Sequence, residues 1–172
     1  MKAVINSGPL IALSKLNLLH LLKTMFQKIY IPESVYNEVV IEGLRKGKQD
    51  AKVTKTFIEE EKDFVYIEEA KHTFKSQRIE LDLGERDTIE LACKLKTDFA
   101  LIDEENTRKE ARNVGLKVKG TLGILVMAHR KGVLSYKELR YFFQQVKARR
   151  DIWISAKLCD EVLKELQQKN II

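Results

Sequence analysis

Short apolar runs alternate with amphipathic helical patterns along the whole chain, and this alternation restricts the fold more than any other feature. Strands that alternate with helices predict a parallel sheet covered on both faces. Phe99-Ala100-Leu101-Ile102 is fully apolar, which is typical of a strand in the middle of such a sheet. The expected strands are residues 2–6, 28–31, 64–67, 99–102 and 116–118.

Helical spacing of apolar residues fills the segments between these strands. Leucines recur from Leu10 to Leu22, and Pro9 suits the first turn of that helix. Gly115 is expected to end a helix that follows Glu104, and Ser155 to cap the last helix, which runs to about Gln168. Residues 68–81 are expected to form a loop or a short helix. The other expected helices are the segment after Pro32, part of 44–63, 84–96, 121–131 and 135–148.

Length and composition favour one folded domain. The 172 residues are 44% hydrophobic and 33% charged, which excludes a disordered chain. We expect a single domain over residues 1–172, with about 135–172 as a C-terminal helical extension. No stretch approaches the ~20 apolar residues of a membrane span, and the first twenty residues do not resemble a signal peptide, so a cytoplasmic protein with no membrane partner is expected.

The net charge of +6 favours a polyanionic partner, because cationic side chains that bind phosphates release condensed counterions. Two basic runs stand out, residues 129–131 and 147–150. Both have the composition of solvated helix ends. The alternative is that one of them lines a groove for RNA.

Polar side chains collect where the expected strands end. Ligands of an open parallel sheet bind at the carboxyl ends of its strands. Carboxylates that gather there repel one another unless a divalent cation neutralises them, and oxygen ligands suit Mg²⁺ or Mn²⁺. The sequence therefore predicts an acidic metal site in a basic protein, which fits phosphodiester hydrolysis. The candidate residues are Asn6, Glu38, Glu85, Asp87, Asp103 and Glu104.

Most of these residues also have an ordinary structural interpretation. Glu38 could be a solvated helix residue, and Glu85 and Asp87 could complement a helix dipole. Glu104 could support the site indirectly or begin a helix, and Asn6 could form a turn before Pro9. Asp103 is the strongest candidate, because it directly follows the fully apolar strand.

Two further features have structural interpretations that we prefer at this point. Trp153 lies in an apolar triplet, which favours core packing or an interface over base stacking. Gly120 and Gly123 are spaced as in some phosphate-binding loops, but close packing of a strand against a helix start explains them.

Five segments resemble, in order and spacing, the motifs of PIN domains, and the resemblance runs from about residue 2 to 168. Asn6 falls in the opening motif, at a position where the family has Asp, and Glu38 falls at the acidic position of the second motif. The segments are residues 5–13, 31–39, 83–92, 101–104 and 115–123, the last resembling a subfamily related to the VapC toxins.

The resemblance implies a three-layer α/β/α sandwich around a parallel sheet of about five strands. It also implies a Mg²⁺- or Mn²⁺-dependent endoribonuclease, a toxin that forms a homodimer and pairs with a small antitoxin protein. Matched positions give Asn6, Glu38, Asp87 and Asp103 as metal ligands, with Glu85 and Glu104 as acidic support, and Glu85 or Asp87 fits the third position equally well. Ser7 and Arg108 would contact phosphate or orient a ligand.

Asn6 departs from the family pattern, because an amide oxygen can bind a cation but brings no negative charge. Two functions therefore stay open: an active ribonuclease, and a catalytically weak PIN module that binds RNA or a partner protein. A small phosphatase or nucleotide binder ranks far lower, because the sequence has neither a Walker loop nor a Rossmann glycine motif.

Overall fold

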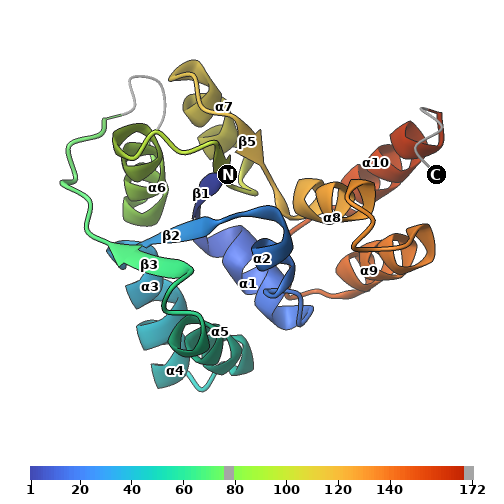
Figure 1. Cartoon of the computed structure of the whole chain (residues 1–172), viewed down its shortest axis with the longest axis horizontal. Coiled ribbons are helices and arrows are strands. Elements are labelled where there is room, and N and C mark those ends of the chain that lie inside the picture. Colours follow the sequence, from blue (N-terminus) through green and yellow to red (C-terminus); the bar gives the residue numbers. More distant parts are fainter. Residues whose placement is uncertain (76–79, 169–172) are drawn as a thin grey trace.

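The central element of the protein is a five-stranded parallel sheet with the strand order β3-β2-β1-β4-β5. We describe residues 1–75 and 80–168 of a computed structural model. Helices cover both faces of the sheet, so the predicted three-layer α/β/α fold is confirmed (Figure 1). The strands are β1 (Lys2–Ile5), β2 (Lys28–Pro32), β3 (Val65–Glu68), β4 (Phe99–Leu101) and β5 (Val118–Lys119).

The strand order places a natural binding crevice beside β1. The chain adds β2 and β3 on one side of β1, and then returns to add β4 and β5 on the other side. Ala3 therefore pairs with Ile29 on one side and with Phe99 on the other. In open α/β sheets, ligands bind at the carboxyl ends of the strands where the order reverses. Here that point lies beyond Ile5 and Leu101.

The helices follow the predicted pattern with two departures. The leucine run from Leu10 to Leu22 is not one helix, because α1 ends where Asn17 takes a left-handed conformation with φ of 57°. The helix after β2 also contains a π-helical turn, η1. The helices are α1 (Ser7–Lys15), α2 (Leu21–Met25), α3 (Glu33–Tyr36), η1 (Asn37–Glu42), α4 (Gly43–Arg45), α5 (Gln49–Glu60), α6 (Leu83–Lys94), α7 (Glu105–Asn113), α8 (Thr121–Arg130), α9 (Tyr136–Ala148) and α10 (Ala156–Gln168).

Both predicted helix boundaries are confirmed. Gly115 has φ of +84°, and it follows α7 directly after Val114. The Ser155 hydroxyl accepts a hydrogen bond from the Leu158 backbone N–H at 3.2 Å at the start of α10. The predicted loop or short helix over 68–81 is irregular chain at 69–75, and its residues 76–79 lie outside the described part.

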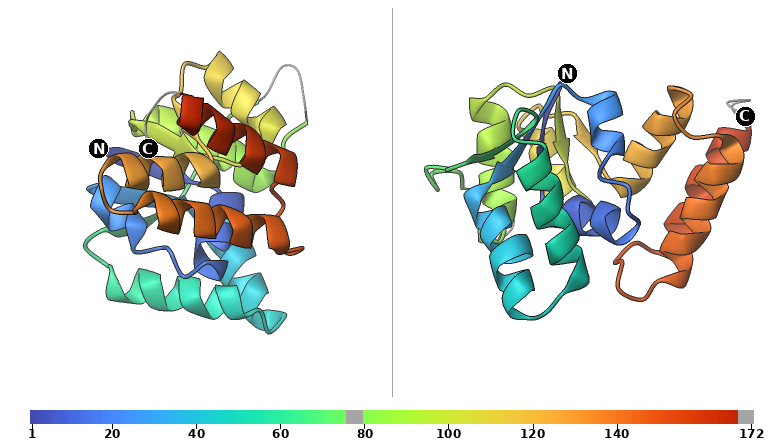
Figure 2. Two further views of the ribbon diagram at one scale, coloured as in Figure 1. Left: turned by 90° about the vertical axis from the view of Figure 1, so that its right-hand side faces the viewer. Right: turned by 60° about the horizontal axis from the view of Figure 1, so that its bottom comes forward.

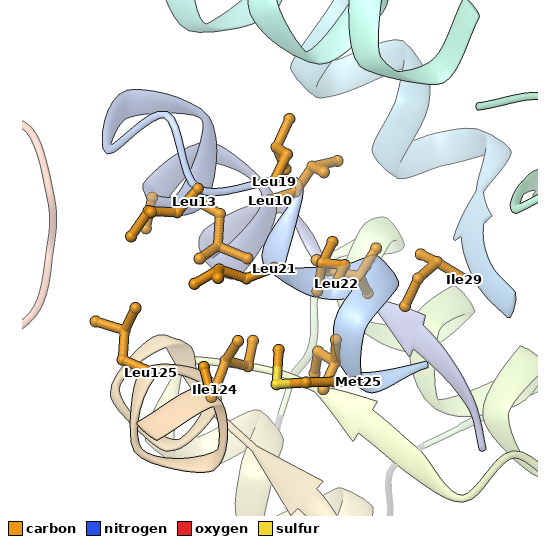
Figure 3. Packing of buried hydrophobic residues seen from close by; sticks show 14 of the residues in the cluster. Leu10, Leu13, Leu19, Leu21, Leu22, Met25, Ile29, Ile124 and Leu125 are labelled. Atoms are coloured by element: carbon orange, nitrogen blue, oxygen red, sulfur yellow. The ribbon is translucent and has the colours of Figure 1, made fainter. Parts of the chain in front are cut away.

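The larger core lies between one face of the sheet and helices α1, α2 and α8. Leucines of α1 and α2 lie beside Ile124 and Leu125 of α8 and beside Ile29 of β2 (Figure 3). Leu22 and Leu13 are fully buried there. The strict alternation of strand side chains sends Ala3 and Ile5 into this core and Val4 to the opposite face.

A second core covers that opposite face. Val4, Ala100 and Ile102 pack against Ile89 of α6 and Ala111 of α7. Helices α6 and α7 thus lie on the other side of the sheet from α1 and α8 (Figure 1). Because β1 and β4 are buried on both faces, their sequences are continuous apolar runs.

Helices α9 and α10 form the C-terminal part, packed side by side beyond α8 (Figure 2). The connection between them is fixed to α1 by Asp151. Arg149 donates two hydrogen bonds of 2.9 Å to the Asp151 carboxylate, and Lys15 Nζ donates to its backbone carbonyl at 2.6 Å. Arg149 and then Lys15 hold the pKa of Asp151 well below its usual range.

Among the residues that the structure describes, no helix is long and apolar enough to cross a membrane.

The core interpretation predicts a large cost for cavity formation at Leu22. Leu22→Ala removes a fully buried side chain between α2, the sheet and α8. We expect the free energy of unfolding to fall by about 2–5 kcal/mol. Leu83→Ala is the matched control, since Leu83 is 44% exposed and should change stability by less than about 0.5 kcal/mol. Urea unfolding followed by circular dichroism measures both, and equal losses would contradict the packing described.

Candidate active site

The candidate site lies where β1 and β4 end, as the sequence predicted. Asn6 directly follows β1, and its backbone N–H donates to the Leu101 carbonyl of β4 at 2.9 Å. Asp103 follows β4 two residues after Leu101. The two candidate residues therefore leave the sheet from neighbouring strands at the same edge.

Asn6 and Glu38 converge on Gly84, the second residue of α6. A Cβ atom on Gly84 would lie 3.5 Å from Glu38 Oε2 and 3.6 Å from Asn6 Oδ1. It would also lie 3.2 Å from a Val35 methyl group, which is tighter than ordinary contact. Glycine at this position therefore lets α6 approach the two oxygen atoms closely. The π-helical turn η1 carries Glu38, and such turns are frequent at functional sites.

Asn6 keeps an oxygen available for a ligand. Its side chain is 5% exposed, and its Oδ1 lies 3.3 Å from the Thr88 hydroxyl. That hydroxyl has one proton and lies closer to the Gly84 carbonyl, at 2.7 Å. The Thr88 hydroxyl therefore donates its proton mainly to the Gly84 carbonyl, and Asn6 Oδ1 can still accept a bond from a ligand.

Glu38 is a carboxylate in an unfavourable electrostatic environment. Glu38 is an exposed residue, but partial loss of water around its carboxylate raises its pKa most, and the negative charges of Asp82 and Glu85 raise it further. A hydrogen bond with Ser7 and the charge of Lys48 act in the opposite direction. Since repulsion from two carboxylates adds to the loss of water, a cation placed here would stabilise the charged form of Glu38.

Asp103 occupies a second, more enclosed position. The Thr121 backbone N–H and hydroxyl each donate to its carboxylate at 2.6 Å. A Cβ atom on Gly120 would lie 2.7 Å from Asp103 Oδ1, and a Cβ atom on Gly8 would lie 3.3 Å from Asp103 Cβ. Burial raises the pKa of Asp103, while Thr121 and the Arg108 guanidinium oppose that rise.

Thr107 connects Glu85 and Glu104 through hydrogen bonds. The Thr107 hydroxyl donates to Glu85 and lies 3.1 Å from Glu104 Oε2, and the Thr107 N–H donates to Glu104 at 2.8 Å. Glu85 Oε2 also accepts from the Asp82 N–H at 2.9 Å in a capping box. Glu104 thus begins α7, as the structural interpretation of the sequence expected, and Glu85 links the starts of α6 and α7.

Both carboxylate oxygens of Asp87 already have hydrogen-bond partners. Its side chain is 1% exposed, and its two oxygens bind Ser34 Oγ at 2.5 Å and His72 Nδ1 at 2.8 Å. The charge of Glu85 raises the pKa of Glu38. Of the two residues that fit the third motif, Asp87 is thus hydrogen-bonded to Ser34 and His72, and Glu85 acts on Glu38.

Arg108 lies on the Asp103 side of the site. A Cβ on Gly120 would lie 2.6 Å from Arg108 Nη1, and the same nitrogen is 3.4 Å from the Ile102 carbonyl. Arg108 Nε is buried without a hydrogen bond to any described residue, and its ion pair with Glu105 is long at 3.8 Å. The guanidinium thus retains donors for a ligand.

The oxygen atoms at the site suit a cation that takes few of its ligands from the protein. Within residues 1–75 and 80–168, no three Asp, Glu, His or Cys side chains gather into a metal-binding group. Mg²⁺ commonly keeps several waters and binds one or two carboxylates together with substrate phosphates. Glu38 and the Asn6 amide oxygen, with Glu85 beside them, match that demand, and Gly84 leaves space above them.

Sequence reasoning missed several contributors, among them Asp82, Ser34, His72 and Thr121. The Asp82-x-x-Glu85 spacing before an apolar helix is a capping-box signal and could have identified Asp82. No local pattern indicates that Thr121 would bind Asp103, or that Ser34 and His72 would bind Asp87, because these contacts join segments distant in sequence.

Comparisons with known proteins agree with this architecture. A family model described as a PIN domain matches residues 2–168. Among ten matching solved chains is a PilT N-terminus domain protein from the hyperthermophilic archaeon Sulfolobus solfataricus P2, 15% identical, with a TM-score of 0.51. The match covers 74% of this chain and 93% of that chain, and at this identity it concerns the fold alone. No curated protein matches the chain. Because the family model spans nearly all of the described sequence, the chain belongs to the PIN-domain family.

Proposed function

We propose that the protein is a Mg²⁺- or Mn²⁺-dependent endoribonuclease. PIN domains are generally nucleases and generally use divalent metals. The observation that carries the proposal is the convergence of Asn6 Oδ1 and Glu38 Oε2 over Gly84, at the sheet edge next to Asp103. The net charge of +6 favours a polyanionic substrate around this acidic centre.

In this proposal Glu38 and Asn6 hold the cation directly, and Glu85 stands beside them. A divalent cation lowers the pKa of a bound water toward about 7 and offsets charge on the phosphodiester. Ser7, by its hydrogen bond to Glu38, orients that carboxylate. Arg108 offers guanidinium donors to the phosphate. Asp103 is the acidic group that follows the neighbouring strand β4 at the same edge of the sheet.

A second function is favoured by two observations: Asn6 in place of a carboxylate, and the bonding of both Asp103 oxygens to Thr121. A site with less negative charge holds cations more weakly. The protein would then be a weak or inactive PIN module that binds RNA or a partner protein.

The toxin role, the homodimer and the antitoxin partner are further parts of the proposal. They rest on the resemblance of residues 115–123 to a VapC-related subfamily. If the protein is a toxin, expression of the wild type arrests growth of a bacterial host, and expression of Glu38→Gln does not. Coexpression with a neighbouring small gene product then identifies the antitoxin.

Activity separates the two functions. We expect Mn²⁺-dependent cleavage of a mixed RNA pool, and a loss on the order of 100-fold in Glu38→Gln and Asp103→Asn. Asn6→Asp adds a negative ligand and should raise cation affinity on the order of 10-fold. Glu59→Gln, an exposed α5 residue, is the control. Cleavage that survives Glu38→Gln contradicts the proposed site, and RNA binding without any cleavage supports the inactive module.

The raised pKa of Glu38 predicts a stability effect independent of activity. A carboxyl whose folded pKa exceeds its unfolded pKa destabilises the fold as pH rises through those values, and the full penalty remains at neutral pH. Glu38→Gln should therefore raise the melting temperature of the metal-free protein at neutral pH. The difference should vanish below about pH 4, where the carboxyl is protonated in both states.

Added Mn²⁺ reverses the order of the two proteins. At about 100 times its dissociation constant, the cation stabilises the wild type by about 2.7 kcal/mol. Glu38→Gln should gain much less, because it lacks the charged ligand. Differential scanning calorimetry in EDTA and in Mn²⁺ measures both effects. Equal Mn²⁺ stabilisation of the two proteins would exclude Glu38 as a ligand.

A further inference from the structure

A pocket of about 480 Å³ is lined in part by Asp103, and Glu38 does not belong to its lining. It lies between β5, α8 and the segment that leads into α10. The volume falls within the range of about 300–1,000 Å³ that is usual for ligand sites. Asp103, Arg108 and Gly120 belong to its lining, so the pocket and the candidate site share a wall.

The charges that line this pocket are almost all positive. Among the described residues of the lining, Arg108, Lys119 and Arg130 are the cations, and Asp103 is the one anion. Two hydrogen bonds from Thr121 already stabilise the Asp103 charge. The side chain of Lys119 lies over Gly123, because a Cβ atom added to Gly123 would lie 3.3 Å from Lys119 Cδ. The pocket is therefore complementary to a polyanion, although it adjoins an acidic centre.

An exposed tryptophan forms the rim. Trp153, the single tryptophan of the chain, is 95% exposed. Of the two roles that the apolar triplet suggested, core packing is wrong, because Ile152 is buried, Ile154 packs against the core, and the ring between them points outward. An interface role for Trp153 stays a prediction. The hydrogen bonds of Asp151 hold this segment against α1. The backbone that carries the ring is thus anchored, and the ring lines the same pocket as the cations.

We propose that this pocket holds a nucleotide of single-stranded RNA next to the scissile phosphate, with a base stacked on Trp153 and flanking phosphates bound by Lys119 and Arg130. Sites for single strands combine a cationic groove with aromatic rings on which bases stack, and such sites tolerate any sequence. The inference deepens the proposed function and rests on it for the identity of the strand. It also assigns a role to the basic run 129–131, through Arg130, whereas Arg149 of the other run binds Asp151.

Trp153 provides its own test, because a base stacked on the ring quenches its fluorescence. The probe is a mixed-sequence 2′-O-methyl RNA oligomer, titrated in EDTA so that no cleavage occurs. We expect saturable quenching with this oligomer. An oligomer of the same length without bases should bind weakly and should not quench.

Variants assign the individual interactions, with binding followed by anisotropy of a labelled oligomer. Trp153→Ala should weaken binding about tenfold or more, and Trp153→Phe should retain most of it. Lys119→Gln with Arg130→Gln should lower the slope of log affinity against log salt by about 0.7 for each phosphate that the protein no longer binds. The matched control is Lys137→Gln with Arg140→Gln on α9.

Each outcome decides the proposal. Binding without quenching, or unchanged affinity in Trp153→Ala, would overturn it. If Trp153→Ala instead splits a dimer in sedimentation while oligomer binding stays unchanged, the ring belongs to a protein interface and the proposal is wrong. Quenching with no RNA cleavage in Mn²⁺ keeps the binding pocket and rejects the nuclease, so the two failures are distinguishable.

Discussion

The carboxylate of Asp103 is the contact on which the rest of the site depends. It receives two hydrogen bonds from Thr121 at the start of α8, faces Gly8 of α1, and is opposed in charge by Arg108 of α7. Three helices from different parts of the chain are thereby fixed at the end of one strand. Glycine is required at position 120, because a Cβ there would lie 2.7 Å from the carboxylate, and a Cβ on Gly8 would be a tight contact at 3.3 Å from Asp103 Cβ. Asp103 also belongs to the lining of the pocket at Trp153.

The acidic half of the site opposes folding, whereas the cores favour it. Burial raises the pKa of both Glu38 and Asp103, and the charges of Asp82 and Glu85 act in the same direction on Glu38. The charged form of each carboxylate is therefore less favourable in the folded protein than in water. The two apolar cores on the sheet offset this electrostatic cost to folding, and a bound cation would remove part of it.

Sequence patterns predicted the elements well, because they report local periodicity. The all-apolar run at 99–102 gave the central strand β4, and Gly115 and Ser155 marked helix boundaries correctly. The patterns could place Asn6 and Asp103 at one edge, since parallel strands end together. They could not choose between Glu85 and Asp87, which lie within one helical turn, because that choice depends on Ser34 and His72 contacting Asp87. The sequence could not exclude Trp153 from the core, because three apolar residues in a row do not reveal which one faces outward.

Acidic and basic side chains are unevenly distributed at the sheet edge, and this distribution determines which residues can attract RNA. An acidic centre repels a polyanion, so Glu38, Asp82 and Glu85 cannot by themselves attract an RNA strand. Attraction has to come from cations nearby, and those of the pocket lie on β5, α7 and α8. The segment that leads into α10 completes that pocket. If the protein acts as proposed, the central sheet would provide the chemistry, and the C-terminal part would add the aromatic surface that retains the strand beside it.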